Sequence, residues 1–424
     1  MISHKLVKLS NGLRVLIVPL PNMESATITV WVGVGSRNEP EKIGGISHFL
    51  EHMVFKGSRK RPSAKEIAEA VDAIGGEFNA ATSKQWTNFY IKARVEVLEK
   101  ASDVLSDMVL APLLKEEDIE REKGVIIEEM AMYEDTPMMK ISDVFEQLIF
   151  KGSSLGRDII GTKQSVKNIT RDDFERYRKT HYYSENMLIT VAGGVKEDKV
   201  LSLVRKYFGG LEKGKKEKEQ KFKAAQKAAR VKLHPKKKEQ AHFILGFLSN
   251  PMGSEERFVE SVLAGILGQG MSSRLFSEVR EKRGLAYSIK TYIDRYVDTG
   301  YIGTYAGVDV KRIDEAIKVT LDQHYGLASG AYKFSKTELV KAKEYIKGHL
   351  ALSLEDTKNI NSFFGVKELI LGKTEAVEQV FAGIDKVSES DLVRLAKKLF
   401  VPEHLNLAII GPYKSQARFE KLLK

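Results

Sequence analysis

The chain has 424 residues, of which 42% are hydrophobic and 29% charged, and its formal net charge at pH 7 is +11. This length exceeds what one ordinary core organises, so we expect a globular protein of two or more domains. No apolar run approaches the roughly 18–20 residues that a membrane-spanning helix needs. The start carries no secretory or transit signal, so we expect a cytoplasmic protein without membrane association. Cysteine is absent, which excludes disulfides and thiolate metal ligands.

Two strand patterns open the chain, over residues 4–20 and 25–35, with a turn signal at Ser10-Asn11-Gly12. Alternating apolar residues bounded by turn residues are typical of strands. A helix is then expected over residues 46–55, ending near Gly57.

That first helix contains His48, Glu51 and His52, in the arrangement H-x-x-E-H. Two histidines four residues apart lie on one face of a helix, so both imidazoles can reach one zinc ion. Glu51 falls on the same face, where it can take a proton from a water at the metal. The flanking residues are apolar, and burying charged groups within such a helix is unfavourable unless they are paired or bind a metal. The pattern therefore predicts a metal centre rather than structural histidines.

The next elements alternate irregularly between helices and hairpin-like strand pairs. We expect a helix that begins with a capping box at Pro62-Ser63-Ala64-Lys65-Glu66 and ends at Gly75-Gly76, strands over 77–83 and 87–91, and helices over about 95–110 and 116–133. This order favours an α+β fold over a parallel doubly wound sheet.

A catalytic zinc usually has three protein ligands, so one more is required. The helix predicted over 116–133 is rich in carboxylates beside an apolar stripe. Periodicity alone does not choose between Glu128 and Glu129.

The excess positive charge lies almost entirely in one segment near the midpoint. Residues 213–238 contain twelve Lys or Arg and two Glu, a net charge of +10. No nucleic-acid-binding motif accompanies them, so we expect a solvated basic linker at 213–239 and no nucleic-acid partner.

The two sides of this linker resemble each other. Glu134-Asp135-Thr136 follows one predicted helix, and Glu355-Asp356-Thr357 follows another 221 residues later. This indicates a duplicated domain of about 200 residues. We expect domains at 1–212 and 240–424, each a largely antiparallel sheet packed with helices.

The run Gly44-Gly45-Ile46-Ser47-His48-Phe49-Leu50-Glu51-His52-Met53-Val54-Phe55-Lys56-Gly57 resembles the inverzincin metallopeptidases, the family of pitrilysin, insulin-degrading enzyme and mitochondrial processing peptidase. In that family the third ligand is a Glu 77 residues after the second His, supported by another Glu seven residues earlier. The resemblance therefore implies Glu129 as a ligand with His48 and His52, and Glu122 as its supporting carboxylate. It also implies that Asn79, on the strand beside the zinc, contacts the substrate backbone.

The second half resembles the family's second signature. There an Arg and a Tyr seven residues apart bind the substrate and stabilise the developing oxyanion, which implies these roles for Arg280 and Tyr287. The second half has no H-x-x-E-H, and Leu350 falls where Glu129 falls in the first half. One Zn2+ per chain is therefore expected.

These observations predict a zinc endopeptidase that hydrolyses peptides or unfolded segments in a closed chamber, with Glu51 as general base. The chain is half as long as pitrilysin, so we expect it to close the chamber as a homodimer or with a related subunit. The segment Gly265-Ile266-Leu267-Gly268-Gln269-Gly270 is shorter than the glycine-rich loop of the processing peptidases, which weakens a presequence-specific role. The alternative is a non-catalytic peptide-binding or scaffold subunit.

Overall fold

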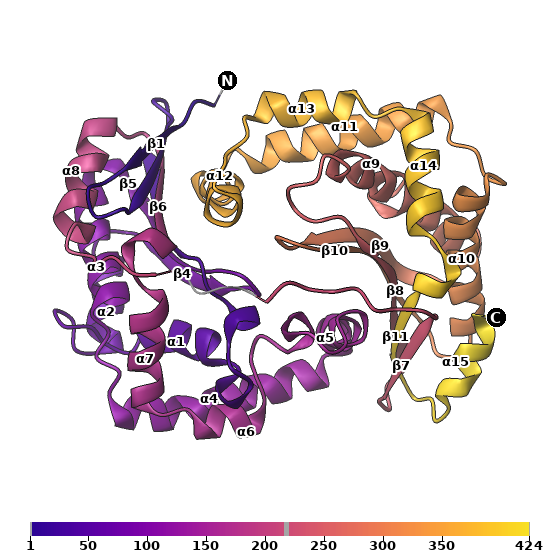
Figure 1. The fold of residues 1–424 in the computed structure, drawn as a ribbon, viewed down its shortest axis with the longest axis horizontal. Coiled ribbons are helices and arrows are strands. Elements are labelled where there is room, and N and C mark those ends of the chain that lie inside the picture. The colour runs from indigo at the N-terminus through magenta and orange to yellow at the C-terminus, as the bar shows by residue number, and fades with distance from the viewer. Residues whose placement is uncertain (1, 216–219, 424) are drawn as a thin grey trace. The chain divides into compact units, whose positions relative to one another are not determined.

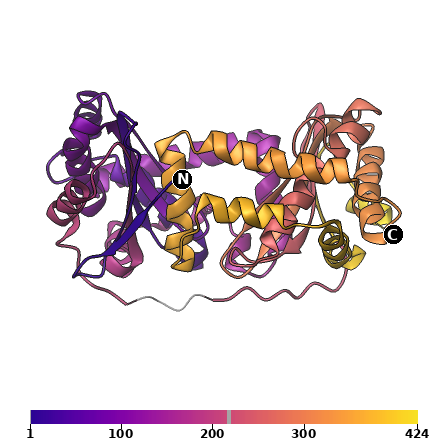
Figure 2. The same cartoon turned by 90° about the horizontal axis from the view of Figure 1, so that it is seen from above.

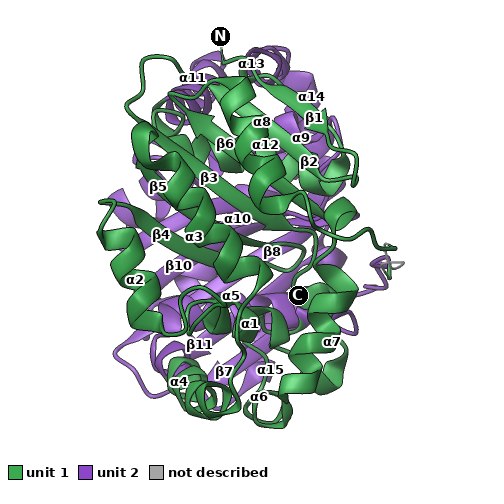
Figure 3. Ribbon diagram, turned by 90° about the vertical axis from the view of Figure 1, so that its left-hand side faces the viewer, with its two compact units in different colours: residues 1–131, 157–220, 352–377 green, residues 132–156, 221–351, 378–424 purple. Residues whose placement is uncertain are grey.

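The structure is a computed structural model that describes residues 2–215 and 220–423. The chain divides into two compact units, coloured green and purple in Figure 3. Unit 1 comprises residues 1–131, 157–220 and 352–377, and unit 2 comprises residues 132–156, 221–351 and 378–424. Each unit contains one sheet and its own core. No helix in the described part of the chain is both long and apolar enough to span a membrane.

The sheet of unit 1 has six strands in the order β1-β2-β6-β3-β5-β4. All neighbouring strands are antiparallel except the pair β2 and β6. The strands are β1 (Lys5–Lys8), β2 (Arg14–Pro19), β3 (Ser25–Val32), β4 (Glu77–Thr82), β5 (Thr87–Arg94) and β6 (Met187–Gly193). Strand β4 pairs with β5 and forms one edge of this sheet.

Most helices of unit 1 contribute apolar residues to the core that this sheet also lines. They are α1 (Ile46–Val54), α2 (Ala64–Asp72), α3 (Leu98–Leu110), α4 (Glu116–Asp135), α6 (Lys163–Asn168), α7 (Arg171–His181) and α8 (Glu197–Phe208), as Figure 1 labels them. Of these helices, α1, α2, α3 and α8 contact the strands of the sheet. The last turn of α4 belongs to unit 2.

The sheet of unit 2 repeats the arrangement with five strands in the order β7-β11-β8-β10-β9. It reproduces the order β2-β6-β3-β5-β4, and its one parallel pair, β7 with β11, corresponds to β2 with β6. The strands are β7 (Arg230–Pro235), β8 (Gln240–Ser249), β9 (Ala286–Arg295), β10 (Gly300–Asp309) and β11 (Asn406–Gly411). The shared topology agrees with a duplicated domain.

The helices of unit 2 are α5 (Pro137–Ile149), α9 (Arg257–Gly268), α10 (Ile313–Ser329), α11 (Lys336–Ser353), α13 (Val377–Asp385), α14 (Glu389–Leu399) and α15 (Gln416–Leu422). The last two residues of α11 and the first residue of α13 are assigned to unit 1. A short π-helix, η6 (Phe276–Glu281), precedes β9.

Each unit takes one helix from the other half of the sequence. Helix α12 (Thr357–Leu371) lies against β3 and β6 of unit 1, as Figure 2 shows beside the indigo strands. Helix α5 covers the equivalent strands β8 and β11 of unit 2. Strand β3 is consequently buried on both faces, with Ile28 in the main core and Trp31 against Gly365 of α12.

The predicted α+β class and the two largely antiparallel sheets are confirmed. The basic linker expected at 213–239 is wrong in its last third, because residues 230–235 form β7. Parallel pairing with β11 supplies backbone partners for these residues, and β7 is an edge strand, where lysine and proline are common. Residues 216–219 of the predicted linker lie outside the described residues. The exchange of α5 and α12 was not part of the prediction of domains at 1–212 and 240–424.

Candidate metal centre

Helix α1 begins at a tightly fixed turn. Its N-cap, Gly45, has a φ of +95°, and a Cβ there would lie 2.6 Å from the carbonyl oxygen of Ile160. Only glycine meets both requirements without strain. The backbone N–H groups of Gly45 and Ser47 donate to the buried carboxylate of Glu39 at 2.6 and 2.8 Å. Glu39 thereby satisfies donors that the first turn of a helix leaves free and complements the helix dipole.

The two faces of α1 have different surroundings. Its buried apolar residues are Ile46, Phe49, Leu50, Met53 and Val54. His48, Glu51 and His52 lie on the other face and are partly exposed. The apolar face therefore fixes the helix, and the remaining face presents all three polar side chains of the motif in one direction.

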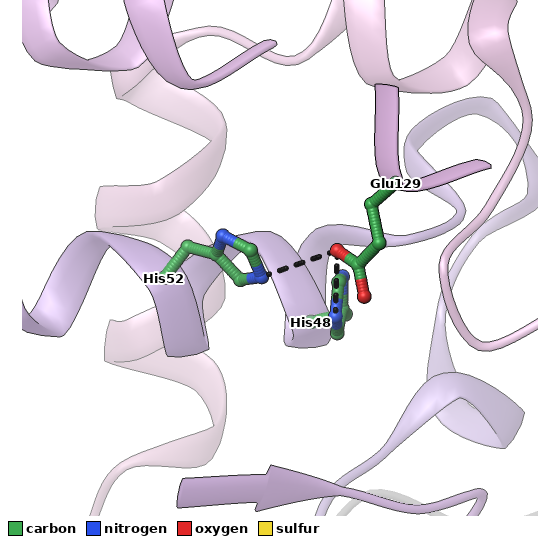
Figure 4. A group of neighbouring side chains, drawn as sticks. All are labelled: His48, His52 and Glu129. Atoms are coloured by element: carbon green, nitrogen blue, oxygen red, sulfur yellow. Dashed lines mark ion pairs between the residues drawn. The ribbon is translucent and has the colours of Figure 1, made fainter. Parts of the chain in front are cut away.

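Helix α4 brings a carboxylate to this face. Glu129 Oε2 lies 3.7 Å from His48 Nε2 and 3.5 Å from His52 Nε2 (Figure 4). Glu128, the other carboxylate that periodicity allowed, is exposed and is not part of this cluster.

This cluster fits a zinc ion. The three ligand atoms of His48, His52 and Glu129 lie within 4.8 Å of one another. In a tetrahedral site with bonds of about 2.0–2.1 Å, ligand atoms lie about 3.4 Å apart. Two imidazoles and one carboxylate are also a common catalytic donor set for zinc. Among the described residues this is the one group of three or more His, Asp or Glu side chains with such geometry.

A second carboxylate orients one of the ligands. Glu122 Oε1 lies 2.9 Å from His52 Nδ1, which directs Nε2 of the same ring toward Glu129. The other oxygen of Glu122 lies 2.6 Å from Nζ of Lys56, which follows the end of α1. Burial raises the pKa of Glu122, but the hydrogen bonds from His52 and Lys56 outweigh burial and hold it below its usual value. Glu122 therefore stays ionised as an acceptor.

Burial controls the protonation of the remaining groups. It lowers the pKa of His48 to about 3, with a smaller contribution from His52. The neutral imidazole that a metal requires is thus the stable form. Burial raises the pKa of Glu129, because it disfavours the charged carboxylate, and the nearby His52 acts in the opposite direction.

The two histidines differ in their second ring nitrogen. His52 Nδ1 contacts Glu122, whereas His48 Nδ1 has no hydrogen-bond partner among the described residues.

The predicted general base is held from the edge strand. Thr82, the last residue of β4, donates from Oγ1 to Glu51 Oε2 at 2.5 Å. Burial raises the pKa of Glu51, and this hydrogen bond acts in the opposite direction.

Asn79 lies on the same edge strand. It is exposed, and its Oδ1 accepts from the backbone N–H of Ala80 at 2.8 Å. Strand β4 thus carries both Asn79 and the contact to Glu51 on the edge beside α1.

The two predicted residues of the second half lie together in unit 2. The guanidinium of Arg280 is 5.4 Å from the ring centre of Tyr287, within cation–π range. The Tyr287 side chain is 79% exposed, so it is available to a molecule from outside unit 2.

Sequence reasoning missed three residues that support the site, namely Glu39, Lys56 and Thr82. Lys56 had a local signal, because it follows His52 by four residues, just past the end of α1. Glu39 and Thr82 reach the centre through tertiary contacts, which no spacing in the sequence displays.

The sequence matches two family models. Residues 14–163 match the insulinase model of peptidase family M16, and residues 168–346 match the model described as the peptidase M16 inactive domain. The metal cluster lies within the first match, whereas Arg280 and Tyr287 lie within the second.

Relatives of known sequence match over nearly the whole chain. An uncharacterized zinc protease of Bacillus subtilis is 38% identical over 414 residues, which cover 95% of this chain and 97% of that protein. An uncharacterized zinc protease of Streptomyces coelicolor is 37% identical, covering 96% of this chain and 89% of that protein.

Solved structures share the fold. A protease from Helicobacter pylori superposes with a TM-score of 0.89 at 25% identity, covering 97% of this chain and 100% of that chain. A peptidase M16 inactive domain from Pseudomonas fluorescens superposes with a TM-score of 0.88 at 17% identity, over 98% of this chain and 99% of that chain, which concerns the fold alone.

Proposed function

Because the chain belongs to peptidase family M16, we propose that it is a zinc-dependent endopeptidase that hydrolyses peptides or unfolded segments. The observation that carries the proposal is the convergence of His48, His52 and Glu129 beside Glu51. The relatives named as zinc proteases support the metal and the reaction class.

In the proposed mechanism His48, His52 and Glu129 hold one zinc ion. When bound, zinc supplies a Lewis acid that lowers the pKa of a water and polarises the scissile carbonyl. Glu51 accepts a proton from the attacking water and later donates it to the leaving amine. Glu122 keeps His52 in the tautomer that directs Nε2 to the metal.

The substrate is proposed to bind as an added strand on the edge of β4. This edge has no other strand paired to it among the described residues, and Asn79 is exposed on it. An extended peptide gains main-chain hydrogen bonds on such an edge. This mode favours unfolded segments, because a folded substrate does not present a free strand.

We also propose that the working unit is a homodimer, in which Arg280 and Tyr287 act at the metal centre of the second copy. The exposure of Tyr287 supports this role, and both side chains suit stabilisation of an oxyanion. A partner of related sequence would meet the same requirement.

The replacement Glu51→Gln tests the proposed reaction. It removes the base while keeping the size of the side chain, so we expect turnover of a quenched peptide to fall by at least about 100-fold. Zinc content measured by atomic absorption should remain that of the wild type, because Glu51 is not a ligand. Full activity in this variant would contradict the mechanism.

The scaffold alternative predicts a different outcome. A wild-type protein without bound zinc and without turnover of any unfolded peptide would identify a non-catalytic peptide-binding subunit. The match of the second half to an inactive-domain model is compatible with this alternative, although the metal cluster lies in the first half.

A further inference from the structure

The edge strand β4 has two unlike faces. Phe78, Ala80 and Thr82 are partly buried, whereas the residues between them are exposed. The ring of Phe78 lies 5.4 Å from that of Phe55, which follows the last residue of α1. The inner face of the proposed substrate-binding strand therefore lies directly against the metal helix.

Thr82 is the polar member of this inner face. Its hydroxyl donates to Glu51 Oε2 and so contacts the proposed base itself. The opposite residue in the strand pair, Thr87, has a hydroxyl with another role, because it donates to the backbone carbonyl of Val34 at 3.0 Å. Of these two paired threonines, Thr82 therefore donates to a side chain and Thr87 donates to the backbone.

We propose that Thr82 is a positioning residue that aligns Glu51 for proton transfer and ties this alignment to the strand on which the peptide binds. The inference rests on the proposed function. A glutamate side chain has several rotatable bonds, and a donor on one carboxylate oxygen restricts them while the second oxygen stays free for water. Pairing of a peptide with β4 orders the strand that carries this donor.

A positioning role predicts an effect on kcat rather than on KM. Thr82 points inward, away from the exposed face of β4, so its hydroxyl has no direct part in holding a peptide. Misalignment of the base raises the barrier of the chemical step and leaves ground-state binding unchanged.

The experiment compares Thr82→Val, Thr82→Ser and the matched control Thr87→Val by steady-state kinetics on a quenched peptide, with zinc content and thermal midpoint measured in parallel. Thr82→Val removes the hydroxyl at nearly constant volume, and we expect kcat to fall about 10-fold with KM and zinc content unchanged. Thr82→Ser keeps the hydroxyl and should restore kcat to within about twofold. Thr87→Val should lower the thermal midpoint and keep kcat.

A wild-type kcat in Thr82→Val would overturn the inference, as would an equal loss of kcat in Thr87→Val or a failure of Thr82→Ser to restore it. Should Thr82→Val fail to fold, Thr82→Ala provides the same comparison. A wild-type protein without zinc-dependent turnover would overturn the proposed function and, with it, this role of Thr82. An active wild type with an unaffected Thr82→Val variant would overturn this role alone.

Discussion

At the scale of single residues, the metal centre depends on a chain of contacts that extends beyond the ligands. Lys56 holds Glu122, and Glu122 in turn holds the Nδ1 of His52. Removal of an outer partner of a metal-bound histidine typically weakens metal binding 10- to 100-fold. In the proposed zinc site, these linked contacts imply that affinity for the ion depends on Lys56, which is not one of the proposed ligands.

We therefore expect Lys56→Met to weaken zinc binding by up to about 10-fold, because Glu122 loses one of the two groups that favour its ionised form. Competition with a chromophoric chelator measures the affinity. The control is Lys60→Met, which removes a lysine from the Asp103 ion pair of the same unit and should leave zinc affinity unchanged. Equal affinities in both variants and the wild type would show that Lys56 has no such role.

The residues of the centre differ in how far the sequence alone could predict them. His48, Glu51 and His52 follow from helical spacing, since all three lie within two turns of α1. Glu129 needed the family resemblance, because periodicity placed Glu128 and Glu129 equally well. Thr82 lies 31 residues from Glu51, and its role depends on β4 folding back against α1. Such contacts can be predicted only from the folded structure, because residue spacing in the sequence does not show them.

At the scale of elements, the direction of α1 is fixed by its first turn. Gly45 has a left-handed φ and lies against the backbone of Ile160, while Glu39 accepts hydrogen bonds from the same turn. His48 and His52 are on α1, whereas Glu129 is on α4. Any displacement of this turn therefore moves both histidines together relative to Glu129.

Gly45→Ala is thus expected to destabilise the protein by roughly 2–3 kcal/mol and to weaken zinc binding, because its Cβ meets the Ile160 carbonyl. Gly75→Ala provides the matched control. Gly75 also has a left-handed φ, of +61°, but a Cβ there meets nothing within 4 Å. It should cost about 1 kcal/mol and leave zinc affinity unchanged. Urea unfolding and chelator competition measure the two quantities, and equal effects of both variants would contradict a special role for the first turn.

Element types were largely predictable, whereas their partners were not. The helix start predicted at Pro62–Glu66 is realised as α2, where the Ser63 hydroxyl caps the helix by accepting from the Glu66 backbone N–H, without the reciprocal bond of a full capping box. The hairpin predicted over 77–91 is realised as β4 and β5. The basic composition of residues 213–238 suggested a solvated segment, but residues 230–235 form β7, because pairing with the distant β11 outweighs local composition.

At the scale of the whole molecule, the two halves share a topology but carry different chemistry. The candidate metal ligands are in the first half, and the Arg280–Tyr287 pair is in the second. In the proposed function each half therefore has a separate role in one reaction, and a second copy could supply either role.

Mixing two inactive variants tests whether the roles combine between copies. Glu51→Gln lacks the base, and Tyr287→Phe lacks the proposed oxyanion donor. If the centre combines residues of two copies, randomly mixed dimers should recover about one quarter of wild-type activity, because half are heterodimers with one intact site of two. The measurement is turnover after subunit exchange, with native mass determined by light scattering. A monomeric mass, or dimers without recovered activity, would contradict the shared site.

The exchange of helices has a consequence for the timing of folding during synthesis. Thr27 of β3 hydrogen bonds to Thr357 of α12, 330 residues later in the chain. A ribosome adding about 5–20 residues per second needs roughly 15–65 s to cover that separation. During this interval β3, including Trp31, lacks the helix that covers its second face. Completion of unit 1 therefore waits for most of the chain to be translated, and until then the nascent N-terminal half would expose apolar surface of the kind that chaperones bind.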